Sequence, residues 1–117
     1  CHVILRGGKE PNYSAEHVKA AAEQLAKAGV TPKLMVDFSH ANSRKDYTRQ
    51  MEVARDVAAQ LQNGEQNIMG IMVESHLVEG RQDKPETYGQ SITDACIGWD
   101  ATEELLALMA EANRGRV

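Results

Sequence analysis

Three residues spread along the sequence carry side chains that commonly bind transition metals. His40 offers an imidazole nitrogen, and Glu74 and Asp94 each offer a carboxylate. This mixed set of nitrogen and oxygen donors suits divalent Mn, Fe, Co or Zn better than Ca or Mg. A lone histidine near a strand is more often a hydrogen-bonded structural residue, so the prediction of a metal site depends on all three side chains reaching one place.

Two further residues could take part in chemistry. Arg6 is followed by Gly7 and Gly8, and its planar guanidinium can pair with two phosphate oxygens while the glycines let backbone approach the anion. A salt bridge from Arg6 to a neighbouring strand is an equally good interpretation. Cys96, two positions after Asp94, could be a metal ligand, a redox-sensitive neighbour or, most commonly, a small buried apolar group.

The elements that must position these residues follow a repeat of strand and helix. Apolar runs predict strands over residues 1–6, 33–39 and 67–73. Their starts lie about 33 residues apart, which is long enough for right-handed crossovers between parallel strands. Ligands of parallel α/β folds gather at the C-terminal ends of the strands. We therefore expect the arginine and the metal candidates on one rim, with Asp94 joining from the loop after the third strand.

Three helices are predicted around these strands. Ser14 is the expected N-cap of the first helix, Asn42 or Ser43 of the second, and Asp100 of the last, with Glu103 completing a capping box. A long polar loop is expected between the third strand and the last helix. The predicted apolar faces comprise Val18, Ala21, Ala22, Leu25 and Ala28, then Tyr47, Met51, Ala54, either Val57 or Ala58, and Leu61, and finally Leu105, Leu106, Leu108 and Met109.

Length and composition narrow the class of protein. The chain has 117 residues, 42% of them hydrophobic, and a net charge of −4 without a basic patch. It therefore suits one globular domain that binds neither nucleic acid nor an anionic membrane. No apolar run approaches the roughly 20 residues that span a bilayer. Two cysteines and no recognisable signal peptide favour a cytoplasmic location.

The predicted fold is α/β but incomplete. Three strand–helix units leave two open sheet edges, and apolar strands of a parallel sheet usually need cover on both faces. A full (β/α)8 TIM barrel needs about 250 residues. We expect residues 1–117 to form a single partial domain, the last three βα units of such a barrel, with a small open α/β sheet as the alternative.

Four segments together resemble one enzyme family. They read "LRGGKEPNYS", "DFSHANS", "MVESHLVEG" and "YGQSITDACIGW", and the resemblance extends over essentially the whole chain. It is to the C-terminal third of the type I 3-deoxy-D-arabino-heptulosonate 7-phosphate (DAHP) synthases of enteric and related bacteria. That family is a (β/α)8 barrel that condenses phosphoenolpyruvate with erythrose 4-phosphate, the first step of the shikimate route to aromatic amino acids.

The resemblance assigns roles to particular residues. It implies that His40, Glu74 and Asp94 are metal ligands and that Arg6 binds the phosphate of phosphoenolpyruvate. We further expect Asp94 to take a proton during the reaction. The family's fourth ligand is a cysteine from an early barrel segment absent from this sequence, and Cys96 would lie near it. The chain alone is therefore expected to be inactive without the missing N-terminal portion of the barrel.

Two alternatives stay open at this point. The chain could be a self-associating module whose exposed strand edges pair with another copy, giving a homo-oligomer without chemistry. It could also belong to another metal-dependent aldolase or synthase barrel that acts on phosphorylated sugars. The motifs "SHAN" and "ITDACIGW" argue against the second alternative.

Overall fold

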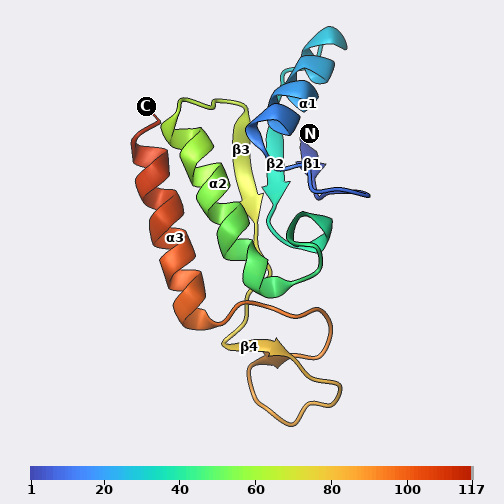
Figure 1. Cartoon of the computed structure of the whole chain (residues 1–117), viewed down its shortest axis with the longest axis vertical. Coiled ribbons are helices and arrows are strands. Elements are labelled where there is room, and N and C mark those ends of the chain that lie inside the picture. Colours follow the sequence, from blue (N-terminus) through green and yellow to red (C-terminus); the bar gives the residue numbers. More distant parts are fainter. Residues whose placement is uncertain (117) are drawn as a thin grey trace.

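The main sheet has three parallel strands. A computed structural model describes residues 1–116, and in it β1 (Val3–Leu5), β2 (Leu34–Asp37) and β3 (Ile68–Met72) lie in the order β1-β2-β3 (Figure 1). Each strand thus pairs with the next one along the chain. The predicted parallel α/β arrangement is confirmed.

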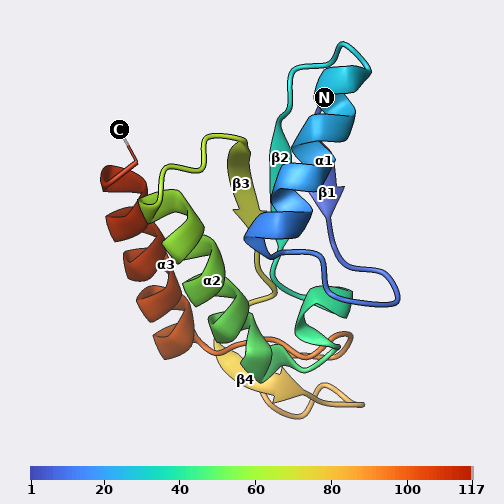
Figure 2. The same ribbon diagram turned by 45° about the horizontal axis from the view of Figure 1, so that its top comes forward.

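Three helices accompany the sheet. They are α1 (Ala15–Lys27), α2 (Gln50–Gln62) and α3 (Trp99–Arg114), and both views show α2 and α3 side by side (Figures 1 and 2). Their buried side chains join those of the strands in one core that includes Val18, Ala22, Leu34, Val36, Val53, Val57, Ile68, Leu105 and Met109. The helices do not cover all of the apolar strand residues, because Ile4 and Met69 remain 51% and 52% exposed.

The second helix begins later than its predicted cap at Asn42 or Ser43. Two short 3-10 turns, η1 (His40–Ser43) and η2 (Tyr47–Arg49), precede α2. His40, Arg44 and Lys45 have φ angles of 51°, 54° and 61°, and residues in this left-handed region cannot continue an α-helix. Asn42 is also engaged elsewhere, because its amide donates to the carbonyls of Leu5 and Asp37.

The segment between β3 and α3 is more ordered than a polar loop. It contains β4 (Val78–Arg81) and β5 (Gln90–Ser91), which pair in parallel, and Figure 1 places β4 beyond the C-terminal ends of the main strands. Backbone hydrogen bonds between Gly80 and Cys96 close the segment. The sequence offered little sign of these strands because both are short and mostly polar.

The last helix also differs in detail from the prediction. Gly98 is the N-cap and Asp100 lies in the first turn, so the predicted capping box does not form. A carboxylate in that turn still interacts favourably with the helix dipole. Leu106 is 55% exposed, whereas Leu105 and Met109 are buried. Within residues 1–116, no helix is both long and apolar enough to cross a membrane.

Candidate metal centre

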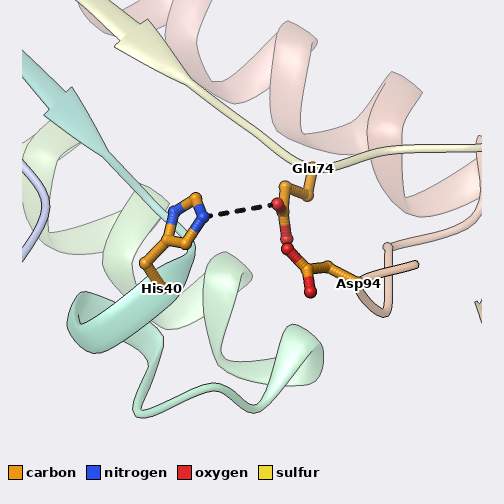
Figure 3. A group of neighbouring side chains, drawn as sticks. All are labelled: His40, Glu74 and Asp94. Carbon is orange, nitrogen blue, oxygen red and sulfur yellow. Dashed lines mark ion pairs between the residues drawn. The ribbon is translucent and has the colours of Figure 1, made fainter.

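The three predicted metal ligands come together at the C-terminal ends of the main strands. His40 begins the turn after β2, Glu74 follows β3 by two residues, and Asp94 lies between β5 and α3. One ligand atom from each residue lies within 4.8 Å of the others. Figure 3 shows the His40 ring and the Asp94 carboxylate on either side of the Glu74 carboxylate.

Both ring nitrogens of His40 face carboxylates. Nδ1 is 2.7 Å from Oδ2 of the buried Asp37, and Nε2 is 3.6 Å from Oε1 of Glu74. The sequence left open whether His40 is a structural residue or a metal ligand. In the structure its Nδ1 makes a structural contact with Asp37, while its Nε2 faces the other candidate ligands. These are compatible, because a metal-binding histidine commonly uses its second nitrogen for a carboxylate.

Glu74 and Asp94 place two negative charges next to each other. Oε2 of Glu74 accepts a 2.7 Å hydrogen bond from the hydroxyl of Ser39. Among residues 1–116, no lysine or arginine forms a salt bridge with either carboxylate. Like charges at this separation repel, and a divalent cation between them would remove that repulsion. The donor set and its geometry thus fit a transition metal.

A pocket of about 400 Å³ surrounds this group. Arg6, Lys45 and Arg81 line it together with the three candidate ligands. In the part of the chain described, Arg6 has no salt bridge, so the interpretation of Arg6 as an ion-pairing residue finds no support there. Arg6 and the three candidate ligands therefore line the same pocket.

Two of these cationic residues, Lys45 and Arg81, were not among the site residues predicted from the sequence. Lys45 reaches the pocket because the turns after β2 replace a helix. Arg81 ends β4, and its side chain donates to the Thr93 carbonyl at 2.9 Å and to Asp83 at 2.8 Å. No local signal in the sequence separates them from other charged loop residues.

Cys96 lies close to the site but outside the group of converging ligands. Its thiol is buried and points toward the Asp94 carbonyl, 3.5 Å away. Burial, and then the nearby negative charge of Glu74, raise the pKa of this thiol above its ordinary value. Cys96 is therefore protonated at neutral pH, as expected of a small buried group rather than of a reactive thiolate.

Comparisons with known proteins give a consistent picture. The model of the DAHP synthetase I family matches residues 1–107. The Phe-sensitive phospho-2-dehydro-3-deoxyheptonate aldolase of Escherichia coli K12 is 57% identical over 99% of this chain and 34% of its own length. A Haemophilus influenzae phospho-2-dehydro-3-deoxyheptonate aldolase is 58% identical over 96% of this chain and 32% of its own length.

A solved structure agrees with these relatives. The phospho-2-dehydro-3-deoxyheptonate aldolase of Francisella tularensis superimposes with a TM-score of 0.95 and 46% identity, over 99% of this chain and 35% of that protein. The chain thus spans about a third of the length of the relatives it matches. A family match over residues 1–107, together with these identities, shows that the chain belongs to the DAHP synthetase I family.

Proposed function

We propose that this chain forms part of the active site of a DAHP synthase, which condenses phosphoenolpyruvate with erythrose 4-phosphate and releases phosphate. The observation that carries the proposal is the convergence of His40, Glu74 and Asp94 in the pocket that Arg6 lines. This convergence occurs in a chain whose relatives are named phospho-2-dehydro-3-deoxyheptonate aldolases.

The chain is proposed to be a single partial domain over residues 1–117, the last three βα units of a TIM barrel. Three adjacent parallel strands and the exposed apolar side chains of Ile4 and Met69 support this proposal. A barrel would cover those side chains with its remaining strands. Because those strands would also carry part of the site, the chain alone is expected to be inactive. The cytoplasmic location remains a prediction.

The cofactor would be a divalent Mn, Fe, Co or Zn ion. His40 would bind it through Nε2, and Glu74 and Asp94 through carboxylate oxygens. When bound, such an ion acts as a Lewis acid that polarises the aldehyde of erythrose 4-phosphate. The nitrogen and oxygen donors support this group of metals but do not choose among its members.

The remaining residues of the pocket would bind and orient the substrates. Arg6 would hold the phosphate of phosphoenolpyruvate by a forked, charge-assisted contact. Lys45 and Arg81 bring further positive charge to the same pocket, which suits two phosphorylated substrates. Asp94 would also accept a proton, since within residues 1–116 no side chain donates a hydrogen bond to its carboxylate.

A chimeric enzyme tests the proposal. Residues 1–117 would replace the matching third of the Escherichia coli relative, and phosphate release would be measured with both substrates and Mn²⁺. We expect the chimera to be active, the isolated chain to be inactive, and His40→Ala in the chimera to abolish activity. His17→Ala is the matched control, because that histidine is exposed on α1, hydrogen-bonds to Ser14 and does not line the pocket.

Two results would contradict the proposal. A folded chimera that binds Mn²⁺ and releases no phosphate would reject the assigned activity. Phosphate release by the isolated chain would reject the division of the site between this chain and other barrel segments.

Self-association is a second candidate function, favoured by the uncovered apolar side of the main sheet. Val3 is 40% exposed and Ile4 is 51% exposed on the edge strand β1. Such an edge can pair with another copy. Sizing chromatography combined with light scattering would detect a homo-oligomer, and a monomer at high concentration would contradict this candidate.

A further inference from the structure

Gln50 contacts the backbone of Glu74 in an unusual way. It is the first residue of α2 and is fully buried. Its side-chain amide donates to the Glu74 carbonyl at 2.9 Å, and its side-chain oxygen accepts from the Glu74 N–H, also at 2.9 Å. One side chain therefore makes the two hydrogen bonds that a neighbouring strand would supply.

This pair of bonds acts where the sheet has ended. The pairing between β2 and β3 extends only to Asp37 and Met72, so the Glu74 N–H is beyond the ladder. Gln50 fixes the peptide groups on both sides of the Glu74 Cα atom. The Ser39 hydroxyl then fixes the carboxylate at 2.7 Å, and together these contacts leave the Glu74 side chain little freedom.

Asp37 does the corresponding work for His40. Its side chain is buried, with Oδ1 accepting from the Ser39 N–H at 2.7 Å and Oδ2 lying 2.7 Å from Nδ1 of His40. A carboxylate at this distance favours the tautomer with the proton on Nδ1. The lone pair of Nε2 is then left facing Glu74, the direction in which a cation would lie.

We infer that Gln50 and Asp37 are positioning residues that hold Glu74 and His40 in metal-binding geometry before the metal arrives. The inference rests on the proposed function, because it takes these two residues as ligands. Neither Gln50 nor Asp37 lines the pocket, so each acts through the ligand that it contacts. Hydrogen bonds of this kind orient ligands and raise metal affinity.

Metal titration of variants tests the inference. Co²⁺ binding to the chimeric enzyme described above, which supplies the remaining barrel segments, would be followed by calorimetry and by the visible absorption of the bound ion, which reports ligand geometry. We expect Gln50→Leu and Asp37→Asn each to weaken binding by about 10- to 100-fold, the usual effect of removing such a contact. The absorption of the remaining complex should also change.

Gln60→Leu is the matched control for Gln50→Leu. Gln60 is a buried glutamine of the same helix, and its amide donates to the Tyr13 carbonyl and to Asp56 instead of to the site. It should leave Co²⁺ affinity and absorption unchanged although it alters packing. If Gln50→Leu does not fold, Gln50→Met keeps the length of the side chain and removes both hydrogen bonds to Glu74 without adding a charge, and weaker binding is again expected.

The outcomes separate the inference from the proposed function. If the unmodified chimera binds no Co²⁺, the proposed metal site is wrong and the inference falls with it. If the chimera binds Co²⁺ and its Gln50 and Asp37 variants bind it equally well, only the inference is wrong. Nitrogen-15 shifts of the His40 ring give a readout without metal: they should report Nδ1–H in the unmodified chimera and a mixture of tautomers in Asp37→Asn.

Discussion

The two sides of the candidate site are built differently. The strand-end side consists of His40, Glu74 and the side chains that hold them, and among those Asp37 is 2% and Gln50 0% exposed. The loop side consists of Asp94 on residues 75–98, where most side chains are exposed. One side is thus buried within a network of hydrogen bonds, and the other projects a carboxylate from a small two-stranded sheet.

Because of this difference, substitutions on the two sides should differ in how they affect the stability of the fold and the binding of ligands. A buried polar group that loses its partner costs free energy, whereas an exposed group finds water instead. Changes on the strand-end side should therefore destabilise the fold as well as the site. Changes on the loop side should affect ligand binding and leave the free energy of unfolding nearly unchanged.

The largest expected effect on stability is that of Asn42→Ala. Asn42 is 3% exposed; it donates to the carbonyls of Leu5 and Asp37 and accepts from the Asn12 N–H. Removing it deletes three hydrogen bonds to backbone groups and should lower the free energy of unfolding by about 4 kcal/mol. Urea unfolding would measure this loss. Asn113→Ala, at an exposed asparagine, is the control. An equal loss of stability in both variants would contradict the structural role of Asn42.

Two glycines compare the two sides directly. Gly7 and Gly89 have φ angles of 84° and 81°, so alanine is strained at both positions, but the new methyl groups meet different neighbours. At Gly7 the methyl would lie 2.8 Å from the backbone nitrogen of Asn42, and at Gly89 it would lie 2.9 Å from Cβ of the exposed Leu77.

At Gly7 the methyl would meet Ala41 Cβ and two backbone atoms within 2.9 Å, whereas at Gly89 only Leu77 Cβ lies that close, in an exposed segment. The two glycine variants should therefore be unequal. We expect Gly89→Ala to lower the free energy of unfolding by about 1 kcal/mol from strain, and Gly7→Ala by about 2 kcal/mol more from overpacking. Thermal or urea unfolding of both variants would show the difference. Equal losses would mean that the strand-end side adjusts as readily as the loop side.

Asp94→Asn should separate binding from stability most clearly. The carboxylate is exposed, so the free energy of unfolding should change by no more than about 0.5 kcal/mol. Co²⁺ affinity should nevertheless fall, because a charged donor is replaced by a neutral one. Parallel unfolding and titration experiments would check both expectations, and a marked loss of stability would show that the loop side is also structural.

The smallest effect concerns thiol chemistry. Cys1 is exposed, whereas Cys96 is buried and has a raised pKa. At a given pH below that raised value, a smaller fraction of Cys96 is thiolate, so iodoacetamide should modify Cys1 first and Cys96 only as the pH increases. Peptide mass spectrometry over a pH series would measure both rates. Equal rates at pH 8 would contradict the burial of Cys96.

The repeat of strand and helix could be predicted from apolar patterning, because the spacing of apolar residues within each strand or helix is visible in a short stretch of sequence. The three main strands and the three helices appear in the expected order, although α2 begins only at Gln50. Ser14 is the N-cap of α1, as predicted. The other two predicted caps were wrong for a physical reason: Asn42 and Asp100 are good caps by residue type, yet Asn42 hydrogen-bonds to the strand ends and Asp100 lies within the first turn after Gly98. Strands as short as β4 and β5 leave no periodic signal.

The sequence by itself determined which residues could bind a cation and, through the strand repeat, that His40 and Glu74 would share a rim. Only the tertiary structure decided that Asp94 reaches them and that Lys45 and Arg81 line the same pocket. Those placements depend on left-handed turns and a small sheet whose hydrogen bonds join residues distant in the sequence. The two hydrogen bonds between Gln50 and Glu74 were also decided only by the tertiary structure, because nothing in the sequence near either residue indicates that they meet.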